Sequence, residues 1–565
     1  MRSHAPAVIA ARIDGAPDAP SGVGSPGSPV SPRALGSPRS RRPHPVAALA
    51  FLVAWILCGS VAVARDAATQ VGEKSPKRDL WYTLSLGGTH CGWIHQLVDE
   101  RDGGVRSVAD TVMKLDRGGQ TVMIEMSTEF LETPDGRPLR MRTRSVTGPT
   151  PLETQYTFPA PQPGAATAAT VDVLSRQGGS ERRSTEPNPP AGWLPPVAAD
   201  RFFNERATAG AAEIVYETID GQSGLNVAKM TAHREGSAEF KLERRTIPVT
   251  VWRVASSLLP IETINHISTD GEIVYSSSML GSQKLETRLS TREVAMRVRR
   301  GASPDVLSST MVQLPRPIPD SLRSSSATYR LSATEGDLPD LPSAGAQRFE
   351  RVDAGHAIVR ELKNEPLPAS AAEIADSAFR APSPMIDFDD DRVKAILADA
   401  LKGHEAAFAA ETAERLRAYV NRFIRTKGLA TAFATAGETA RSREGDCSEH
   451  AVLLCALLRG AGVPARVAVG LVYADDFAGK RNVFAWHMWT QALIPEQTES
   501  PAQGAPPAPR SFWVDFDATL PGATRFHAAH ILTGATALAE GAMDPQLAAI
   551  VPLLGKLRIE VVEVK

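Results

Sequence analysis

The hydrophobic pattern of the chain predicts strands in its first half and helices in its last third. Short runs rich in β-branched and aromatic residues begin at Asp79, and turn signals follow every 15–17 residues from Gly87 to Asp135. This spacing is typical of an antiparallel meander of strands joined by tight turns. Because strand-like runs continue to about residue 300, we predict one β-rich domain over residues 79–300.

The period of the apolar residues changes beyond Asp387. They recur at helical spacing over 393–400 and again over 413–424, which predicts two helices at the start of a C-terminal domain, residues 383–565. The proline-interrupted residues 301–382 predict a connector or a small β subdomain, and residues 65–78 predict a linker.

The first 64 residues predict export. Residues 1–45 hold nine prolines and six arginines against two aspartates, a composition typical of a disordered basic segment. The 19 uncharged residues at 46–64 then predict either a signal peptide cleaved near Ala64 or an N-terminal membrane anchor. Both place the rest of the chain in the periplasm or cell envelope, because the arginines stay inside the cell.

Composition narrows the chemistry. The balance of 62 Lys+Arg against 64 Asp+Glu gives a net charge of −2, which argues against a nucleic-acid partner. Four cysteines without a C-x-x-C pair support neither a disulfide scaffold nor a zinc ribbon. We therefore expect individual side chains to carry the chemistry, without a cofactor.

Cys447 is the candidate nucleophile. It follows Asp446, and Glu449 lies three residues after that aspartate, the spacing of a capping box at a helix start. The apolar residues continue at helical spacing to Gly460. Unsatisfied backbone N–H groups in a first helical turn stabilise a thiolate. Cys455, deeper in the same predicted helix, lacks this advantage, so we expect it to be an inert packing residue.

Two later runs of strand character supply a candidate base and a candidate orienting carboxylate. His487 lies in the first run, and Asp515 and Asp517 lie in the second. The two aspartates point to the same face of a strand, so alternation leaves both open. The proline-rich stretch 495–510 between the runs predicts a long surface loop within a hairpin.

Three ordered blocks of sequence resemble the core of bacterial transglutaminase-like proteins. They are GDCSEHA at 445–451 with LRGAGVPAR at 458–466, HMW at 487–489, and WVDFDAT at 513–519. That family commonly has His-Ala-Trp in the second block and Trp-x-x-x-Asp-Pro-Thr in the third. This chain departs from it at Met488 and Ala518, both outside the expected catalytic positions.

The resemblance covers about residues 385–525 and implies a papain-like α+β domain that follows the N-terminal all-β, antiparallel module. It selects Asp517 rather than Asp515. The implied catalytic residues are Cys447, which attacks an amide carbonyl to form a thioester, His487, which takes and returns the proton, and Asp517, which orients the imidazole. The backbone N–H of Cys447 is the expected oxyanion donor.

The function implied is that of an exported cysteine-dependent acyl-transfer enzyme acting on peptide or glutamine-type amide bonds of a protein or peptide. We expect hydrolysis first, by a peptidase, amidase or deamidase, and transamidation second. The same three residues can catalyse hydrolysis and transamidation, and the acceptor that reaches the thioester determines which of the two reactions occurs. The alternative is a catalytically silent scaffold whose cleft binds peptides while the β module engages an envelope partner.

A zinc site is the other interpretation of the same histidines. His450 lies three residues after Cys447, so the pair, together with His487, offers zinc ligands, and His527 and His530 add imidazoles. No second cysteine pair closes a tetrahedral site, so we expect no metal. The expected role of His450 is packing or support of the cysteine helix.

Overall fold

The computed structural model describes residues 77–565 except 102, 118, 149, 161–169, 178–179, 243–244, 299–302, 404–407, 429–432, 497–509 and 540–550. The predicted export segment and nearly all of the predicted linker therefore lie outside the described residues. The described residues belong to one compact unit. Within them, no helix has both the length and the apolar character needed to cross a bilayer.

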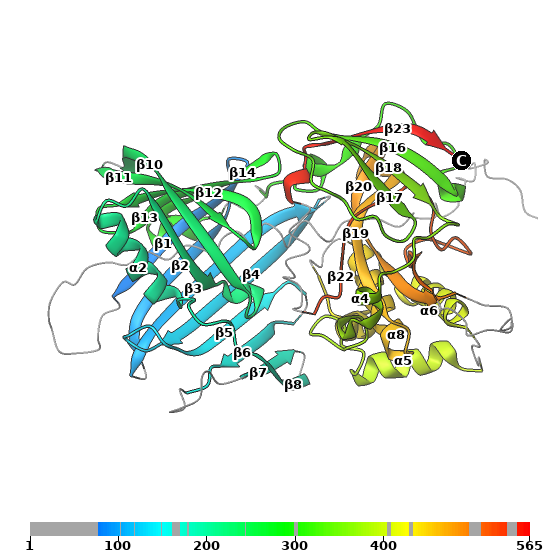
Figure 1. Cartoon of the computed structure of the whole chain (residues 1–565), viewed down its shortest axis with the longest axis horizontal. Helices are drawn as coiled ribbons and strands as arrows, with labels where there is room; N and C mark the ends of the chain where they lie inside the picture. The colour runs from blue at the N-terminus through cyan, green and yellow to red at the C-terminus, as the bar shows by residue number, and fades with distance from the viewer. Residues whose placement is uncertain are drawn as a thin grey trace, which may run out of the picture. The chain divides into compact units, whose positions relative to one another are not determined.

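A sheet of fourteen antiparallel strands forms the N-terminal module (Figure 1). The strands are β1 Arg78–Leu86, β2 Thr89–Arg101, β3 Gly104–Arg117, β4 Gln120–Glu132, β5 Pro138–Val146, β6 Leu152–Thr157, β7 Thr170–Gln177, β8 Ser180–Pro187, β9 Glu213–Ile219, β10 Val227–Leu242, β11 Arg245–Ser256, β12 Leu259–Ser268, β13 Ile273–Leu280 and β14 Gln283–Ser290. Their order is β8 to β1 and then β14 to β9, so two meanders meet where β1 pairs with β14. The predicted antiparallel all-β module is confirmed.

Local sequence explains these strands. Along β4, Val122, Ile124 and Met126 are buried, and exposed or half-buried residues alternate with them. One face of the strand therefore packs into the core. The turn between β1 and β2 uses Gly87 and Gly88, whose φ values of 55° and 78° suit a two-residue hairpin turn and favour glycine.

One long helix of this module was not predicted. Helix α2 (Pro196–Thr208) lies between β8 and β9, so helices begin well before the predicted start beyond Asp387. Its first residue is a proline, whose fixed φ suits the first helical turn. The buried Asp200 of α2 pairs with Arg78 of β1 at 3.3 Å, which ties the helix to the sheet.

Short helical elements also occur between residues 221 and 379. They are η1 Gly221–Ser223, α3 Arg292–Ala295, η2 Ser308–Thr310, η3 Ser321–Arg323 and η4 Ser377–Phe379.

The C-terminal part is α+β, as predicted. Its five-stranded sheet contains β15 Val312–Gln313, β19 Ala465–Phe477, β20 Lys480–Pro495, β21 Ser511–Phe516 and β22 His530–Thr536. Its helices are α4 Ala371–Ala375, α5 Asp391–Leu401, α6 Ala409–Phe423, α7 Ala436–Ser442 and α8 Cys447–Gly460. Helices α5 and α6 confirm the two predicted from apolar spacing. Helix α8 packs against β19 and β20 (Figure 1).

A third, four-stranded sheet joins residues from both sides of position 383. It contains β16 Ser326–Ala333, β17 Gln347–Asp353, β18 His356–Leu362 and β23 Leu557–Val564, in the order β17-β18-β16-β23. The short η6 (Val551–Leu553) precedes β23. The C-terminal strand thus completes a sheet whose other strands lie in the predicted connector, and the domain boundaries themselves stay predictions.

This small sheet supports the segment around β22. The Tyr329 hydroxyl of β16 donates to the Ala528 carbonyl at 3.0 Å. Gln347 of β17 donates to the Leu532 carbonyl at 2.8 Å and accepts from the Leu532 N–H at 2.7 Å. Two strands of the small sheet therefore fix the backbone on both sides of His530.

If β23 stabilises the structure by packing into the core, a truncation on its buried side should cost far more than one on its exposed side. Ile559 is 7% exposed and Val562 is 51% exposed on the same strand. We expect Ile559→Ala to lower the free energy of unfolding by about 2–4 kcal/mol and Val562→Ala by less than about 1 kcal/mol, measured by urea denaturation. Equal losses would contradict the placement of β23.

Candidate active site

Cys447 is the first residue of α8, as the capping-box spacing predicted. The Asp446 side chain accepts a hydrogen bond from the Ser448 N–H at 2.9 Å, and the Glu449 carboxylate accepts one from the Asp446 N–H at 2.8 Å. These reciprocal bonds satisfy two of the donors that a helix start leaves open. They fix the turn that carries the thiol, and Cys447 itself is 0% exposed.

The capping residues form a buried acidic pair. Burial, together with the neighbouring Asp446 carboxylate, raises the pKa of Glu449 to about 8. Arg117, at the end of β3, donates to Asp446 at 2.7 Å, and the two side chains are 0% and 1% exposed. The cap of the cysteine helix is thus paired with a cation from the β module. Sequence analysis missed this residue, because the glycines after Arg117 were interpreted only as a turn.

His450 supports the same helix start, the role expected for it. Its Nδ1 donates to the Asp446 carbonyl at 2.6 Å, while Nε2 has no hydrogen-bond partner among the described residues. Burial and the nearby Lys427 ammonium lower the pKa of His450 to about 4. His450 is therefore neutral at pH 7, and its proton lies on Nδ1.

Strand β20 carries His487 beside the cysteine helix. It pairs with β19 along its length and with β21 from Thr490 onward, which confirms the predicted hairpin. Nearly all of the loop predicted for this hairpin lies outside the described residues. The Thr490 hydroxyl donates to the Ala451 carbonyl at 2.9 Å. That contact lies one helical turn beyond Cys447 and three residues beyond His487, so the two candidate residues lie on adjoining elements.

His487 and Asp517 are hydrogen-bonded. Nε2 of His487 lies 2.8 Å from Oδ2 of Asp517, and the side chains are 2% and 1% exposed. Because a carboxylate only accepts, Nε2 carries the proton in this contact and Nδ1 keeps its lone pair. Nδ1 has no hydrogen-bond partner among the described residues, so the ring presents a free basic nitrogen.

Asp517 lies just past β21, not within a strand as predicted. Its Oδ1 accepts from the Thr519 N–H at 2.8 Å and from the Thr519 hydroxyl at 2.6 Å, a local turn that competes with strand pairing. From α6, Arg417 and Asn421 donate to carbonyls of the segment that follows, at Leu520 and Ala518. The carboxylate is therefore held by the segment that follows it.

The two imidazoles beside Asp517 keep its carboxyl group ionised. Burial alone raises the pKa of a carboxyl, but the His487 and His530 imidazoles hold the pKa of Asp517 well below its usual range. Asp515, the alternative, bonds elsewhere: it accepts from Trp489 Nε1 and from Gln491 Nε2, both at 2.8 Å. Geometry thus pairs His487 with Asp517.

A second imidazole reaches the same carboxylate. Nε2 of His530, on β22, lies 3.3 Å from Oδ2 of Asp517, and Nδ1 lies 2.9 Å from the His527 carbonyl. Burial lowers the pKa of His530 and, further, that of His527. Sequence analysis noted both histidines only as additional imidazoles. No local signal connects them to Asp517, because the contact depends on how β22 pairs with β19.

One group of ligand-type side chains comes together here. His487, Asp517 and His530 each offer one ligand atom, and the three atoms lie within 4.8 Å of one another. Cys447 and His450, which the sequence suggested as zinc ligands alongside His487, are not part of this group. The arrangement therefore combines a base hydrogen-bonded to a carboxylate with two nitrogens and one oxygen suited to a metal.

A family model matches the part of the chain that contains this site. Residues 395–518 match the family model for the transglutaminase-like superfamily. These residues form a transglutaminase-like domain. The match spans all three candidate catalytic residues and supports either a cysteine-dependent enzyme that acts on peptides or a scaffold of the same fold. No curated protein matches the chain.

Solved structures match parts of the chain only distantly. They include a domain of unknown function from Brucella abortus (12% identity, 38% of this chain and 95% of that chain, TM-score 0.30) and a proposed cysteine protease from Cytophaga hutchinsonii (14%, 42% and 86%, 0.23). The periplasmic domain of TgpA from Pseudomonas aeruginosa, bound to ethylmercury, also matches (15%, 37% and 88%, 0.21). At such TM-scores they support no inference about activity.

The other cysteine of α8 behaves as expected for a packing residue. Cys455 is 0% exposed, and burial raises the pKa of its thiol. Within the transglutaminase-like domain, α8 therefore holds two thiols in different settings. One lies at the capped helix start, and the other lies two turns deeper in the core.

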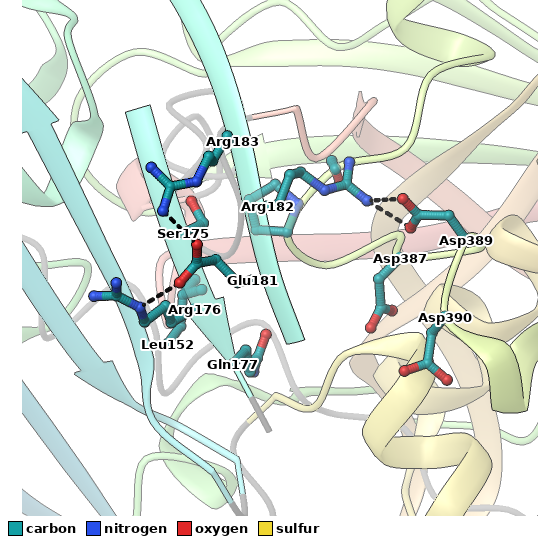
Figure 2. A pocket seen from close by; sticks show the side chains of 12 residues that line it. Leu152, Ser175, Arg176, Gln177, Glu181, Arg182, Arg183, Asp387, Asp389 and Asp390 are labelled. Atoms are coloured by element: carbon teal, nitrogen blue, oxygen red, sulfur yellow. Dashed lines mark hydrogen bonds and ion pairs between the residues drawn. The ribbon is translucent and has the colours of Figure 1, made fainter. Parts of the chain in front are cut away.

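A polar pocket of about 480 Å³ lies elsewhere, between the β7–β8 hairpin and residues 383–390 (Figure 2). Its charged side chains already have protein partners. Glu181 pairs with Arg176 and Arg183, and Arg182 pairs with Asp389 (Figure 2). Asp390 pairs with Arg441, and Asp387 accepts hydrogen bonds from Thr435 and Gly437. Because every charged side chain that lines the pocket has a protein partner, we assign no ligand to it.

If Arg117 neutralises the cap of the cysteine helix, removing it should leave Asp446 as an unpaired buried charge. We expect Arg117→Met to lower the free energy of unfolding by about 3–5 kcal/mol. The matched control is Arg144→Met, because Arg144 pairs with Glu125 at 3.3 Å on the partly exposed surface of the same sheet. That change should cost about 0–1 kcal/mol. Chemical denaturation measures both, and similar costs would contradict the role of Arg117.

Proposed function

We propose that the protein is an exported cysteine-dependent acyl-transfer enzyme that cleaves peptide or glutamine-type amide bonds through a thioester. The observation that carries this proposal is the buried hydrogen bond between His487 and Asp517, beside a helix that starts at Cys447. The match of this region to the transglutaminase-like superfamily supports it.

The hydrogen bonds support a proposed role for each atom. With Nε2–H held by Asp517, Nδ1 of His487 is the nitrogen that takes the proton from the Cys447 thiol. The sulfur then attacks the amide carbonyl, and the proton passes to the leaving amine as the thioester forms. The start of α8 favours negative charge on the sulfur, and the Cys447 N–H is the proposed oxyanion donor.

The acceptor of the acyl group decides the outcome. Water can attack the thioester wherever the thioester is exposed to solvent, whereas an amine needs a binding site of its own. We therefore propose hydrolysis as the main reaction and transamidation as the second. Substrate access requires a movement of the residues that cover Cys447, since the thiol is 0% exposed in this structure. We propose a periplasmic or envelope location from the sequence of residues 46–64.

The second candidate function is a catalytically silent scaffold. The complete burial of Cys447 favours it, because a thiol without exposed surface does not meet a peptide unless the domain opens. In that case the fold serves only to bind peptides, and the β module binds an envelope partner. The reactivity of Cys447 separates the two functions.

Turnover should depend on Cys447. We expect residues 65–565, incubated with a mixture of unfolded proteins, to produce new N-termini detectable by mass spectrometry, and Cys447→Ala to reduce them at least about 1000-fold. Cys455→Ala is the matched control and should retain activity, because that thiol is a packing residue. Deamidated glutamines in place of new termini would indicate a deamidase, and cross-linked amines would indicate transamidation. Identical products from Cys447→Ala would contradict an enzymatic function.

A further inference from the structure

His530 has an acceptor at each ring nitrogen. Nδ1 lies 2.9 Å from the His527 carbonyl, and Nε2 lies 3.3 Å from the Asp517 carboxylate. A neutral imidazole has one N–H, so it can donate to only one of them. With the proton on Nδ1, in the shorter contact, the lone pair of Nε2 faces a carboxylate oxygen. A cation bound between Nε2 and this oxygen would satisfy both groups.

The His487 ring supplies a third donor atom to the same oxygen. Its Nε2 lies 2.8 Å from Oδ2 of Asp517, and one ligand atom from each of the three residues lies within 4.8 Å of the others. Two imidazole nitrogens and one carboxylate oxygen are ligands typical of Zn²⁺. Ligand atoms of a tetrahedral zinc site lie about 3.4 Å apart, so a small rotation of the rings brings these atoms into range.

Two of the three residues, His530 and Asp517, have hydrogen bonds of the kind that orient metal ligands. Metal-binding histidines usually donate their other N–H to a carbonyl or carboxylate, as His530 does to the His527 carbonyl. The second oxygen of Asp517 is held by the Thr519 N–H and hydroxyl, which leaves Oδ2 for an ion. All three ligand residues are at most 2% exposed, so the site is shielded from water.

We propose that His487, Asp517 and His530 bind a divalent transition metal ion of the Zn²⁺ class, and that the bound ion blocks the base. Binding at Nε2 of His487 moves the proton of that nitrogen to Nδ1, so no proton is lost. A protonated Nδ1 cannot accept the proton of a thiol. This regulation rests on the proposed function, because a blocked base affects the protein only if His487 acts as a base in that function.

The site can be tested on the purified full chain carrying Cys447→Ala and no polyhistidine tag, so that neither a reactive thiol nor the tag binds metal. Equilibrium dialysis against Zn²⁺, with metal quantified by mass spectrometry, should give one tightly bound equivalent per chain. Mg²⁺ prefers oxygen ligands and should not bind. His530→Asn should weaken Zn²⁺ binding at least about tenfold, since even loss of an outer-shell partner does so.

Two further variants make the result decisive. His487→Gln should weaken Zn²⁺ binding as His530→Asn does. His233→Asn should leave Zn²⁺ binding unchanged, because the His233 side chain is exposed on β10. Circular dichroism verifies that each variant is folded. The absence of a tight equivalent, or its persistence in both ligand variants, would overturn the proposal. Turnover plays no part in this measurement, so the metal site and the proposed enzymatic function fail independently of each other.

Discussion

The buried carboxylate of Asp517 is the constraint on which the candidate site depends. Thr519 holds one of its oxygens, and His487 and His530 share the other at 2.8 and 3.3 Å. A buried charge needs hydrogen-bond donors, and the His487 Nε2–H, the Thr519 N–H and the Thr519 hydroxyl supply them to Asp517. The same carboxylate therefore sets the tautomer of His487 and leaves Nδ1 available to the thiol. It also lies opposite Nε2 of His530, where we propose that a cation binds.

The cysteine helix depends on distant parts of the chain as well as on its own cap. Asp446 and Glu449 close the first turn, but the charge of Asp446 is paired with Arg117 of the β module. The small sheet, completed by the C-terminal strand, supports the segment that carries His530 through Tyr329. Residues outside the matched region therefore support both the cysteine helix and the segment that carries His530.

The features predicted from sequence are those with local signals. The spacing of Asp446 and Glu449 located the helix start, and glycine spacing located the strand turns. The alternation of strand faces could not distinguish Asp515 from Asp517 as the partner of His487. Only the resemblance to transglutaminase-like proteins selected Asp517. The bond from Arg117 to Asp446 joins residues 329 positions apart, and no periodicity in one sequence encodes such a contact. Helix α2 was missed because the prolines and Gly192 before its start resemble a loop.

The pH dependence of Cys447 alkylation tests directly whether His487 takes the proton of the Cys447 thiol. We expect iodoacetamide to alkylate Cys447 in the folded chain with an apparent pKa below that of an ordinary cysteine, and we expect His487→Ala to raise this pKa toward the ordinary value. Cys455 serves as the internal reference and should stay unlabelled until the chain unfolds. Equal, slow labelling of both cysteines at neutral pH, unaffected by His487→Ala, would contradict the account.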